Sequence, residues 1–260
     1  MAEARQWALV LGCSSGFGAA TAVELARAGL DVFGVHLDRK STLAQAEAVA
    51  EAIRGAGREA IFFNANAADE DRRAEVLGQI AARLSGKARI RLLFHSLAFG
   101  SLKSFVGEDP LTQGQLEMTL DVMAHSLVYW TQGLTFHELL ARPAHVLAMT
   151  SEGSSVVWNG YGAVSAAKAA LEAHVRQLAV ELADRDIAVN AIRGGVAETA
   201  AARKIPGFEQ LKALSVRRNP HGRLTTPRDV AVFVAALAKL ESAWMTGNVI
   251  GVDGGEHLVG

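Results

Sequence analysis

The sequence predicts an α/β protein built on one doubly wound parallel sheet with helices on both faces, and three observations lead to this prediction. Segments with strand-like and helix-like patterns alternate along the whole chain. The strand-like segments are continuous apolar runs, which is typical of strands covered on both faces. The chain has 260 residues, half of them hydrophobic, which suits a single domain spanning residues 1–260.

Each expected element rests on a local pattern. The first strand, "WALVLG", is a short apolar run closed by a glycine, and similar runs predict strands at 7–12, 31–37, 59–66, 89–96, 144–151, 187–193 and 248–255. Helical spacing of apolar residues predicts helices between them, at 20–30, 41–57, 69–86, 112–141, 161–182 and 227–240. A loop-rich segment is expected between the strand at 187–193 and the last helix.

Charge and cysteine content exclude several classes of protein. Lys and Arg total 26 and Asp and Glu total 27, so the net charge is −1 and no overall field selects nucleic acid or a membrane surface. A single cysteine, Cys13, allows neither an internal disulfide nor a cysteine metal cluster, and no metal site is expected. No apolar run reaches the roughly 18 residues of a membrane span. We therefore expect a soluble, cytoplasmic protein.

A glycine-rich loop follows the first expected strand. In "GCSSGFG", Gly12, Gly16 and Gly18 have the spacing G-x-x-x-G-x-G, which differs from G-x-G-x-x-G. Gly12 permits a tight turn, Gly16 a close backbone approach to a pyrophosphate, and Gly18 close packing of helix on sheet. Ser14 and Ser15 offer hydroxyl groups, and the following helix offers its N-terminal N–H groups. The alternative is a turn without a ligand, but its place between strand and helix favours a dinucleotide.

Several motifs together resemble the short-chain dehydrogenase/reductase family over nearly the whole chain. They are the glycine triplet, "NAN" at 64–66, the helix with Tyr161 and Lys168, "VNAIRGG" at 189–195 and "TGNVIGVDGG" at 246–255. The resemblance implies a Rossmann-like fold, a nicotinamide cofactor, a Ser–Tyr–Lys active site and usually a homotetramer. The expected cofactor-binding residues are Gly12, Ser14, Ser15, Gly16, Phe17, Gly18, Arg39, Asn66, Ala67, Ser96, Leu97, Ala98, Lys168, Ala197 and Thr199.

The end of the second strand bears on the choice of cofactor. An acidic residue there usually binds the ribose diol and favours NAD. In the family this position corresponds to His36, and Asp38 lies two residues further on. Arg39 and Lys40 follow, where cations could meet a 2′-phosphate. Although Ser15 stands where many NADP-dependent relatives carry arginine, and "DRK" could be a solvated turn, we predict NADPH, with NADH as the alternative.

The helix at 161–182 carries the expected acid. The chain has two tyrosines, and Tyr129 lies on another helix, where aromatic core packing is expected. Tyr161 and Lys168 are seven apart and so share one helix face. The residue four before Lys168 is Val164, so the tyrosine is displaced about one turn toward the helix start. In enoyl-thioester reduction, charge develops on an oxygen remote from the carbon that accepts hydride, which this displacement could serve.

The spacing Y-x6-K resembles the enoyl-acyl-carrier-protein reductase branch of the family. "HSLAF" at 95–99 is similar to the same branch, and Met123 stands where other relatives carry an asparagine. Ser151 occupies the slot of a second tyrosine found in some members, and it aligns with the serine of ordinary relatives. The resemblance makes Ser151, Tyr161 and Lys168 the expected catalytic residues, with Lys168 also holding the nicotinamide ribose. Arg193 in "IRGG" has no evident role in the sequence.

Residues 200–223 resemble the family's substrate lid. Six basic residues there face one acid, Glu209, and they are Arg203, Lys204, Lys212, Arg217, Arg218 and Arg223. A positive rim would suit coenzyme A, a pantetheine phosphate or an acidic acyl carrier protein. The sequence thus predicts an NAD(P)H-dependent reductase of an enoyl thioester. The alternatives are a carbonyl reductase or alcohol dehydrogenase on the same fold, and a dinucleotide-binding sensor without turnover.

Overall fold

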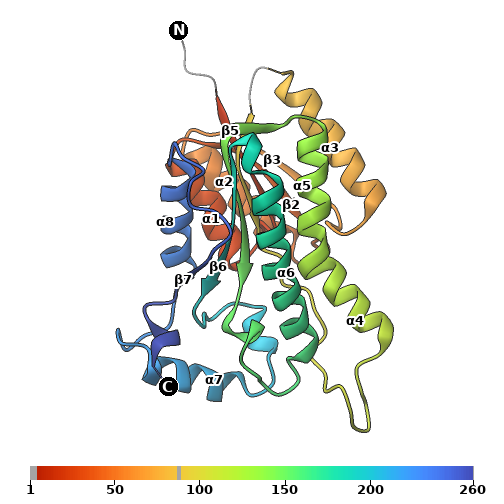
Figure 1. Ribbon diagram of the computed structural model, residues 1–260, viewed down its shortest axis with the longest axis vertical. Helices are drawn as coiled ribbons and strands as arrows, with labels where there is room; N and C mark the ends of the chain where they lie inside the picture. Colours follow the sequence, from red (N-terminus) through yellow and green to blue (C-terminus); the bar gives the residue numbers. More distant parts are fainter. Residues whose placement is uncertain (1–4, 87–88, 260) are drawn as a thin grey trace.

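The structure, a computed structural model, describes residues 5–86 and 89–259 of the chain. Seven parallel strands form one sheet in the order β3-β2-β1-β4-β5-β6-β7. They are β1 (Gln6–Leu11), β2 (Asp31–His36), β3 (Ala60–Asn64), β4 (Arg89–His95), β5 (Leu140–Thr150), β6 (Ile187–Gly194) and β7 (Val249–Val252). The predicted parallel sheet is confirmed, and its carboxyl ends point toward the bottom of Figure 1.

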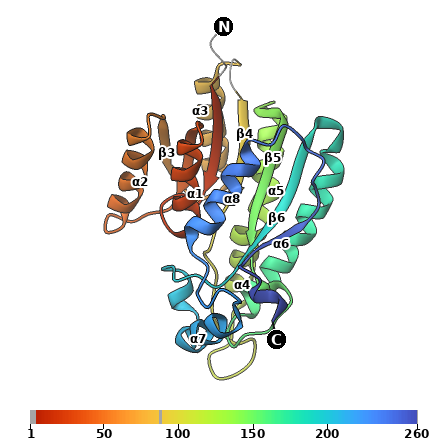
Figure 2. The same cartoon turned by 90° about the vertical axis from the view of Figure 1, so that its left-hand side faces the viewer.

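Helices cover both faces of this sheet. One face carries α1 (Gly16–Arg27), α2 (Leu43–Gly55) and α8 (Pro227–Ala238), and the other carries α3 (Glu70–Leu84), α5 (Ser126–Phe136) and α6 (Gly162–Glu181). Figure 2 shows the two helical layers on either side of the strands. Alternate residues of β1 enter different cores, since Leu9 and Leu11 face one layer and Ala8 and Val10 the other. The predicted doubly wound architecture is therefore confirmed.

The turn after β1 buries the single cysteine of the chain. Cys13 is fully buried, and a Cβ atom at Gly34 of β2 would lie 2.6 Å from its Sγ. Burial raises the pKa of the Cys13 thiol far above its ordinary value. Cys13 therefore acts as a small apolar core residue.

The helix predicted at 112–141 is continuous from 113 to 136, so only its predicted end is wrong. It consists of α4 (Gln113–Leu120), a π-helical turn (Asp121–His125) and α5, which ends at Phe136. The sequence did not predict the π-helical turn, in which the backbone hydrogen bonds change to i→i+5 spacing. Glu138, with φ of 52°, then turns the chain into β5, which begins at Leu140 rather than 144.

The segment 200–223 is more ordered than the expected loop. It contains a 3₁₀ turn (Ala202–Lys204) and helix α7 (Phe208–Arg218). Figures 1 and 2 show α7 beneath the carboxyl ends of the strands, beside the C-terminal part of the chain. The segment therefore covers the edge of the sheet where a ligand is expected.

Among the described residues, no helix combines the length and the apolar character needed to cross a membrane.

Candidate active site

Two cavities adjoin at the carboxyl edge of the sheet. The first cavity has about 280 Å³ and lies beyond the ends of β1, β2 and β4. The second cavity has about 390 Å³ and lies beyond the ends of β5 and β6, against α7. Phe17 and Thr199 line both cavities. Ligands of open α/β sheets bind at this edge, so the two cavities form one candidate site.

The glycine loop forms a tight cradle beside the first cavity. Gly12 has φ of 85° and Gly16 has φ of 55°. A Cβ atom at Gly12 would lie 2.3 Å from the carbonyl oxygen of Ser96, and one at Gly18 would lie 2.0 Å from the carbonyl oxygen of Gly12. Only glycine permits these approaches, which bring the N-terminus of α1 to the cavity. The cradle and its N–H groups fit the pyrophosphate of a dinucleotide.

Most of the expected cofactor residues line the cavities. Those in the first cavity are Gly12, Ser14, Ser15, Gly16, Phe17, Asn66, Ala67, Ser96, Leu97, Ala98 and Thr199, and Ala197 lines the second. Three expected residues line neither cavity. Gly18 shapes the turn, Arg39 is exposed beyond β2, and Lys168 is buried behind the cavity wall.

The end of β2 contains a polar cluster that the sequence did not reveal. His36 Nδ1 lies 2.9 Å from Asp38 Oδ2, and the hydroxyls of Ser14 and Thr42 lie near the same carboxylate. Burial alone would raise the pKa of the Asp38 carboxyl, but these polar neighbours outweigh burial and hold the pKa below its usual range. Ser14 thus lies beside Asp38, whereas Arg39 and Lys40 remain exposed.

Ser151 and Tyr161 meet at the wall of the second cavity. Ser151 directly follows β5, and Tyr161 directly precedes α6. Gly153 leaves room for both, because a Cβ atom there would lie 2.5 Å from Tyr161 Cε1 and 3.3 Å from Ser151 Oγ. Burial raises the pKa of the Tyr161 phenol, and the nearby Ser151 hydroxyl partly opposes this shift. Ser151 Oγ is buried and has no well-formed hydrogen bond within the described part of the chain, so its hydrogen-bonding capacity is unused there.

The other tyrosine lies away from the cavities. Tyr129 on α5 is only partly buried, and the guanidinium carbon of Arg73 lies 4.9 Å from its ring centre. The predicted role in core packing is therefore wrong, because a cation–π contact at the surface holds this ring. Tyr161 is the tyrosine that reaches the candidate site.

Lys168 lies behind the wall that carries Ser151. Its Nζ donates a hydrogen bond of 2.7 Å to the carbonyl oxygen of Met149, which lines the second cavity. Burial lowers the pKa of Lys168 to about 8, although the Glu172 carboxylate favours the charged form. Glu172 Oε1 also accepts a hydrogen bond of 2.6 Å from Thr150 Oγ1. The i,i+4 spacing of Lys168 and Glu172 was the available signal for this neighbour.

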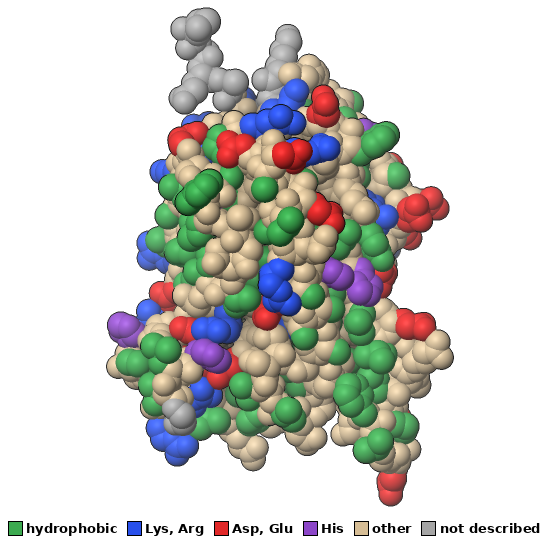
Figure 3. Space-filling view, viewed as in Figure 1, with side chains coloured by type: hydrophobic (Ala, Val, Ile, Leu, Met, Phe, Trp, Pro, Cys, Tyr) green, Lys and Arg blue, Asp and Glu red, His purple; other side chains and the backbone are tan. Residues whose placement is uncertain are grey.

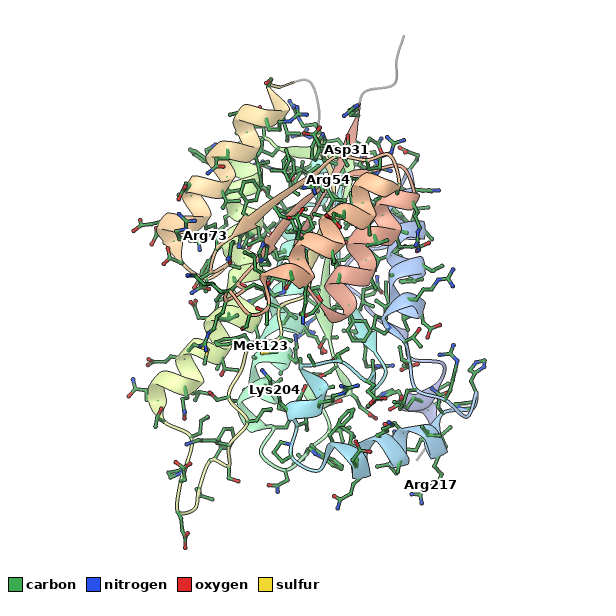
Figure 4. The ribbon with its side chains drawn as sticks, turned by 180° about the vertical axis from the view of Figure 1, so that it is seen from behind. Asp31, Arg54, Arg73, Met123, Lys204 and Arg217 are labelled. Carbon is green, nitrogen blue, oxygen red and sulfur yellow. The ribbon has the colours of Figure 1, made fainter. Side chains whose placement is uncertain are left out.

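The slot four residues before Lys168 is closed by apolar atoms. Val164 is 5% exposed and Met123 is 3% exposed. A Cβ atom at Gly100 would lie 3.0 Å from Val164 Cγ2 and 2.9 Å from Met123 Sδ, so the three residues pack together. Met123, labelled in Figure 4, belongs to the π-helical turn between α4 and α5. The position four residues before Lys168, where a tyrosine would give the four-residue spacing, is therefore filled by apolar side chains and not by another polar group.

Arg193 receives a structural role. It lies opposite Thr150 in the pairing of β5 with β6 and lines the second cavity. Its Nε lies 3.5 Å from Asp253 Oδ2, just beyond β7. Arg193 thus links the ends of two neighbouring strands by an ion pair.

The predicted positive rim of segment 200–223 is wrong for four of its six basic residues. Acids outside the segment pair with them: Arg203 and Lys212 with Glu198, Arg218 with Glu152, and Arg223 with Asp229. Lys204 and Arg217 have no ion pair within the described residues, and Arg217 points outward from α7 in Figure 4. Figure 3 shows basic and acidic side chains interspersed over the lower part of the molecule, where α7 lies. Glu198 and Asp229 lie just outside the two ends of the segment, and Glu152 is distant along the chain.

Comparison with known proteins bears on the family of the chain. A family model described as enoyl-(acyl carrier protein) reductase matches residues 12–257. The chain is 32% identical over 270 residues to cis-4-hydroxycyclohexanecarboxylate dehydrogenase of Sinomonas cyclohexanicum, covering 99% of each protein.

Two solved structures resemble the chain over nearly its whole length. Enoyl-[acyl-carrier-protein] reductase (NADH) of Aquifex aeolicus has a TM-score of 0.83 and 25% identity, covering 99% of this chain and 98% of that one. A short-chain dehydrogenase of Burkholderia cenocepacia in complex with NADP has a TM-score of 0.83 and 26% identity, covering 98% of each. Fold and site thus define an NAD(P)-dependent oxidoreductase. The chain belongs to the short-chain dehydrogenase/reductase family.

Proposed function

We propose that the protein reduces the 2,3-double bond of an enoyl thioester with NADPH. The observation that carries this proposal is the position of the Tyr161 phenol. It lies beside Ser151 on the second cavity, one turn before the slot that Val164 fills with apolar atoms. The family model matched by the chain carries the description of an enoyl reductase and supports the same reading.

The chemistry follows from where charge develops. A bound nicotinamide would supply hydride to C3 of the substrate, and the electrons of the double bond would move onto the thioester oxygen at C1. C2 would then take a proton from solvent, which returns the electrons from the oxygen and completes the saturated thioester. Tyr161 donates a hydrogen bond or a proton to that oxygen. Ser151 offers its hydroxyl to the same oxygen. Lys168 would have to release its hydrogen bond to Met149 to hold the nicotinamide ribose, and in its protonated form it would stabilise anionic character on the phenol.

NADPH is proposed on the charges that follow β2. Arg39 and Lys40 are exposed there and suit a 2′-phosphate. NADH is the alternative, because Asp38 places a carboxylate in the same region and the two structural relatives above carry NADH and NADP in their names.

The carrier and the assembly are part of the proposal. Lys204 suits the phosphate of coenzyme A or of a carrier-linked pantetheine arm, and segment 200–223 serves as the cover of the substrate cavity. We also propose a homotetramer, supported by family resemblance and by the exposed apolar side chains of Phe136 and Val180, 82% and 76% exposed. Sedimentation velocity tests this assembly, and a monomer at working concentration would exclude it.

The second candidate is reduction of a carbonyl or oxidation of an alcohol. The 32% identity to a hydroxycyclohexanecarboxylate dehydrogenase favours it. The closed slot at Val164 and Met123 argues against it, because a phenol at that position is absent.

Cofactor oxidation with crotonyl-coenzyme A, measured beside a panel of ketones, separates these functions. Rapid oxidation with the crotonyl thioester alone is expected. Turnover of ketones alone would overturn the enoyl substrate, and cofactor binding without turnover of any substrate would favour a dinucleotide sensor.

A further inference from the structure

Ser151 and Tyr161 stand at the two ends of one loop. This loop joins β5 to α6, so its path sets the separation of the two side chains. Within it, the carbonyl oxygen of Gly153 accepts a hydrogen bond from Ser165 on α6. The loop also touches segment 200–223, and the contacts fall near its two ends.

At the Tyr161 end, Trp158 makes the contact. Its Nε1 donates a hydrogen bond of 2.8 Å to the carbonyl oxygen of Pro206, in segment 200–223. Its own carbonyl oxygen accepts a hydrogen bond of 3.1 Å from the backbone N–H of Tyr161. Pro206 also packs on Gly160, where a Cβ atom would lie 3.3 Å from Pro206 Cγ. One residue thus links the covering segment to the backbone of the expected acid.

At the Ser151 end, Glu152 makes the contact. Its Oε1 accepts a hydrogen bond of 2.9 Å from Arg218 Nη2, at the last residue of α7. The two side chains are only 23% and 17% exposed, so solvent screens this ion pair incompletely. Arg218 Nε also donates a hydrogen bond of 2.7 Å to the carbonyl oxygen of Val259, and His257 Nδ1 lies 3.2 Å from Glu152 Oε1. The C-terminal residues therefore support this attachment.

We infer that segment 200–223 positions Ser151 and Tyr161 by holding their loop near both ends, with Trp158 and Glu152 as the positioning residues. The inference rests on the proposed function, because it takes Ser151 and Tyr161 as the pair that acts on the substrate. Leu211 and Leu214 of α7 line the same cavity as this pair. A substrate long enough to pack on α7 therefore stabilises both attachments, and its binding free energy contributes to turnover as well as to affinity.

Trp158→Phe tests the attachment at Tyr161. The change keeps an aromatic ring but removes the indole N–H, and loss of one hydrogen bond should lower kcat about 2–10-fold with little change in KM. Trp244→Phe is the matched control, because Trp244 is 95% exposed and should leave kcat unchanged. An unchanged kcat in Trp158→Phe overturns the inference.

Glu152→Gln tests the attachment at Ser151. It removes the charge that pairs with Arg218, and kcat should fall roughly 10-fold. Glu209→Gln, at an exposed position on α7 itself, is the control for loss of an acid from the covering segment. An equal fall of kcat in both variants would mean that the change of net charge lowers kcat, and it would overturn the role of the Glu152–Arg218 attachment.

A double-mutant cycle distinguishes positioning from a separate role in the cavity. If Trp158 acts through the phenol, Trp158→Phe should change the residual rate of a Tyr161→Phe variant by less than about 2-fold. An equal loss in both backgrounds would overturn the positioning role and assign Trp158 to substrate contact. The cycle can be run with whichever substrate is turned over, so a ketone substrate would refute the proposed function without refuting this inference.

Amide hydrogen exchange gives a readout that needs no turnover. The amides of residues 156–161 should exchange about 2–10-fold faster in Trp158→Phe than in Trp244→Phe, because the loop loses one anchor. Exchange at the same rate in the two variants would overturn the inference even if kcat had fallen. A Tyr161→Phe variant with full turnover would refute the proposed acid, while the exchange rates would still decide whether the segment holds the loop.

Discussion

At the scale of single residues, Tyr161 carries the clearest expectation. Its phenol is buried beside Ser151, where burial raises its pKa and keeps it protonated near neutrality. Tyr161→Phe should lower turnover of the crotonyl thioester about 10²–10⁴-fold, the usual effect of losing a general acid. Cofactor titration should show nearly unchanged affinity. Tyr129→Phe serves as the control on the surface of α5, and equal rates for the two variants would refute the assignment.

The buried charge of Lys168 predicts a pH dependence of stability. Its pKa is lowered from 10.5 to about 8 in the folded protein, mainly by burial. Between these values the unfolded chain binds a proton that the folded chain lacks, so this residue makes the free energy of unfolding rise with pH. Urea unfolding of the cofactor-free protein across this window should show that rise, and Lys168→Met should flatten it. An equal slope in the variant would contradict the lowered pKa.

Arg39 predicts which cofactor is preferred. If its guanidinium meets a 2′-phosphate, Arg39→Ala should weaken NADPH binding roughly 10-fold, the loss of one charge-assisted hydrogen bond. NADH binding, measured by nucleotide fluorescence, should stay nearly unchanged. Equal weakening of both cofactors would mean that Arg39 supports the loop rather than a phosphate.

The roles of single residues were predictable from the sequence where the position allows only one residue type or follows directly from the strand–helix pattern. Gly12 and Gly18 are required by backbone contacts, and Ser151 and Tyr161 lie where the strand–helix pattern brings them together. The surroundings of Asp38 and Glu172 were not predictable, because the approach of Ser14 to Asp38 and the hydrogen bond from Thr150 to Glu172 depend on distances across the fold.

At the scale of elements, α6 links the tyrosine spacing to the substrate. The double change Tyr161→Phe with Val164→Tyr restores the four-residue spacing and should abolish reduction of the crotonyl thioester, because the phenol moves one turn along the helix. It need not create a ketone reductase, since Met123 remains in the neighbouring slot.

Stability must be measured beside this rate. Val164 packs against Gly100, so a tyrosine there should overfill the core and cost about 1–3 kcal/mol. The melting temperature with saturating cofactor shows whether the double variant folds. Enoyl reduction that survives in a well-folded double variant would break the link between spacing and substrate.

Strands and helices were predicted best where the spacing of apolar residues stayed regular along the whole element. Every strand was expected in its place, since parallel strands are simple apolar runs. The π-helical turn between α4 and α5 was not predicted, because it changes the backbone hydrogen bonds without ending the helix. Helix α7 was missed because segment 200–223 is rich in charged residues, and its partners Glu152 and Glu198 lie outside it.

At the scale of the whole molecule, parallel strands bring both cavities to one edge. Phe17 and Thr199 lie between them, so a dinucleotide in the first cavity and a substrate in the second would meet at these residues. The alternation of strands and helices predicts this edge from the sequence. The charge of its rim depends on ion pairs with acids outside segment 200–223, of which Glu152 is distant along the chain while Glu198 and Asp229 adjoin the segment.

Because Cys13 is buried, thiol-reactive labels should not react with the native chain. Its thiol lies within the core behind β1, and its raised pKa keeps it in the unreactive form. A fluorophore coupled to a cysteine introduced at an exposed site, such as Glu209→Cys on α7 or Val157→Cys on the loop, would therefore report from that site alone. The distance between α7 and the loop can thus be followed during turnover without first removing a natural cysteine.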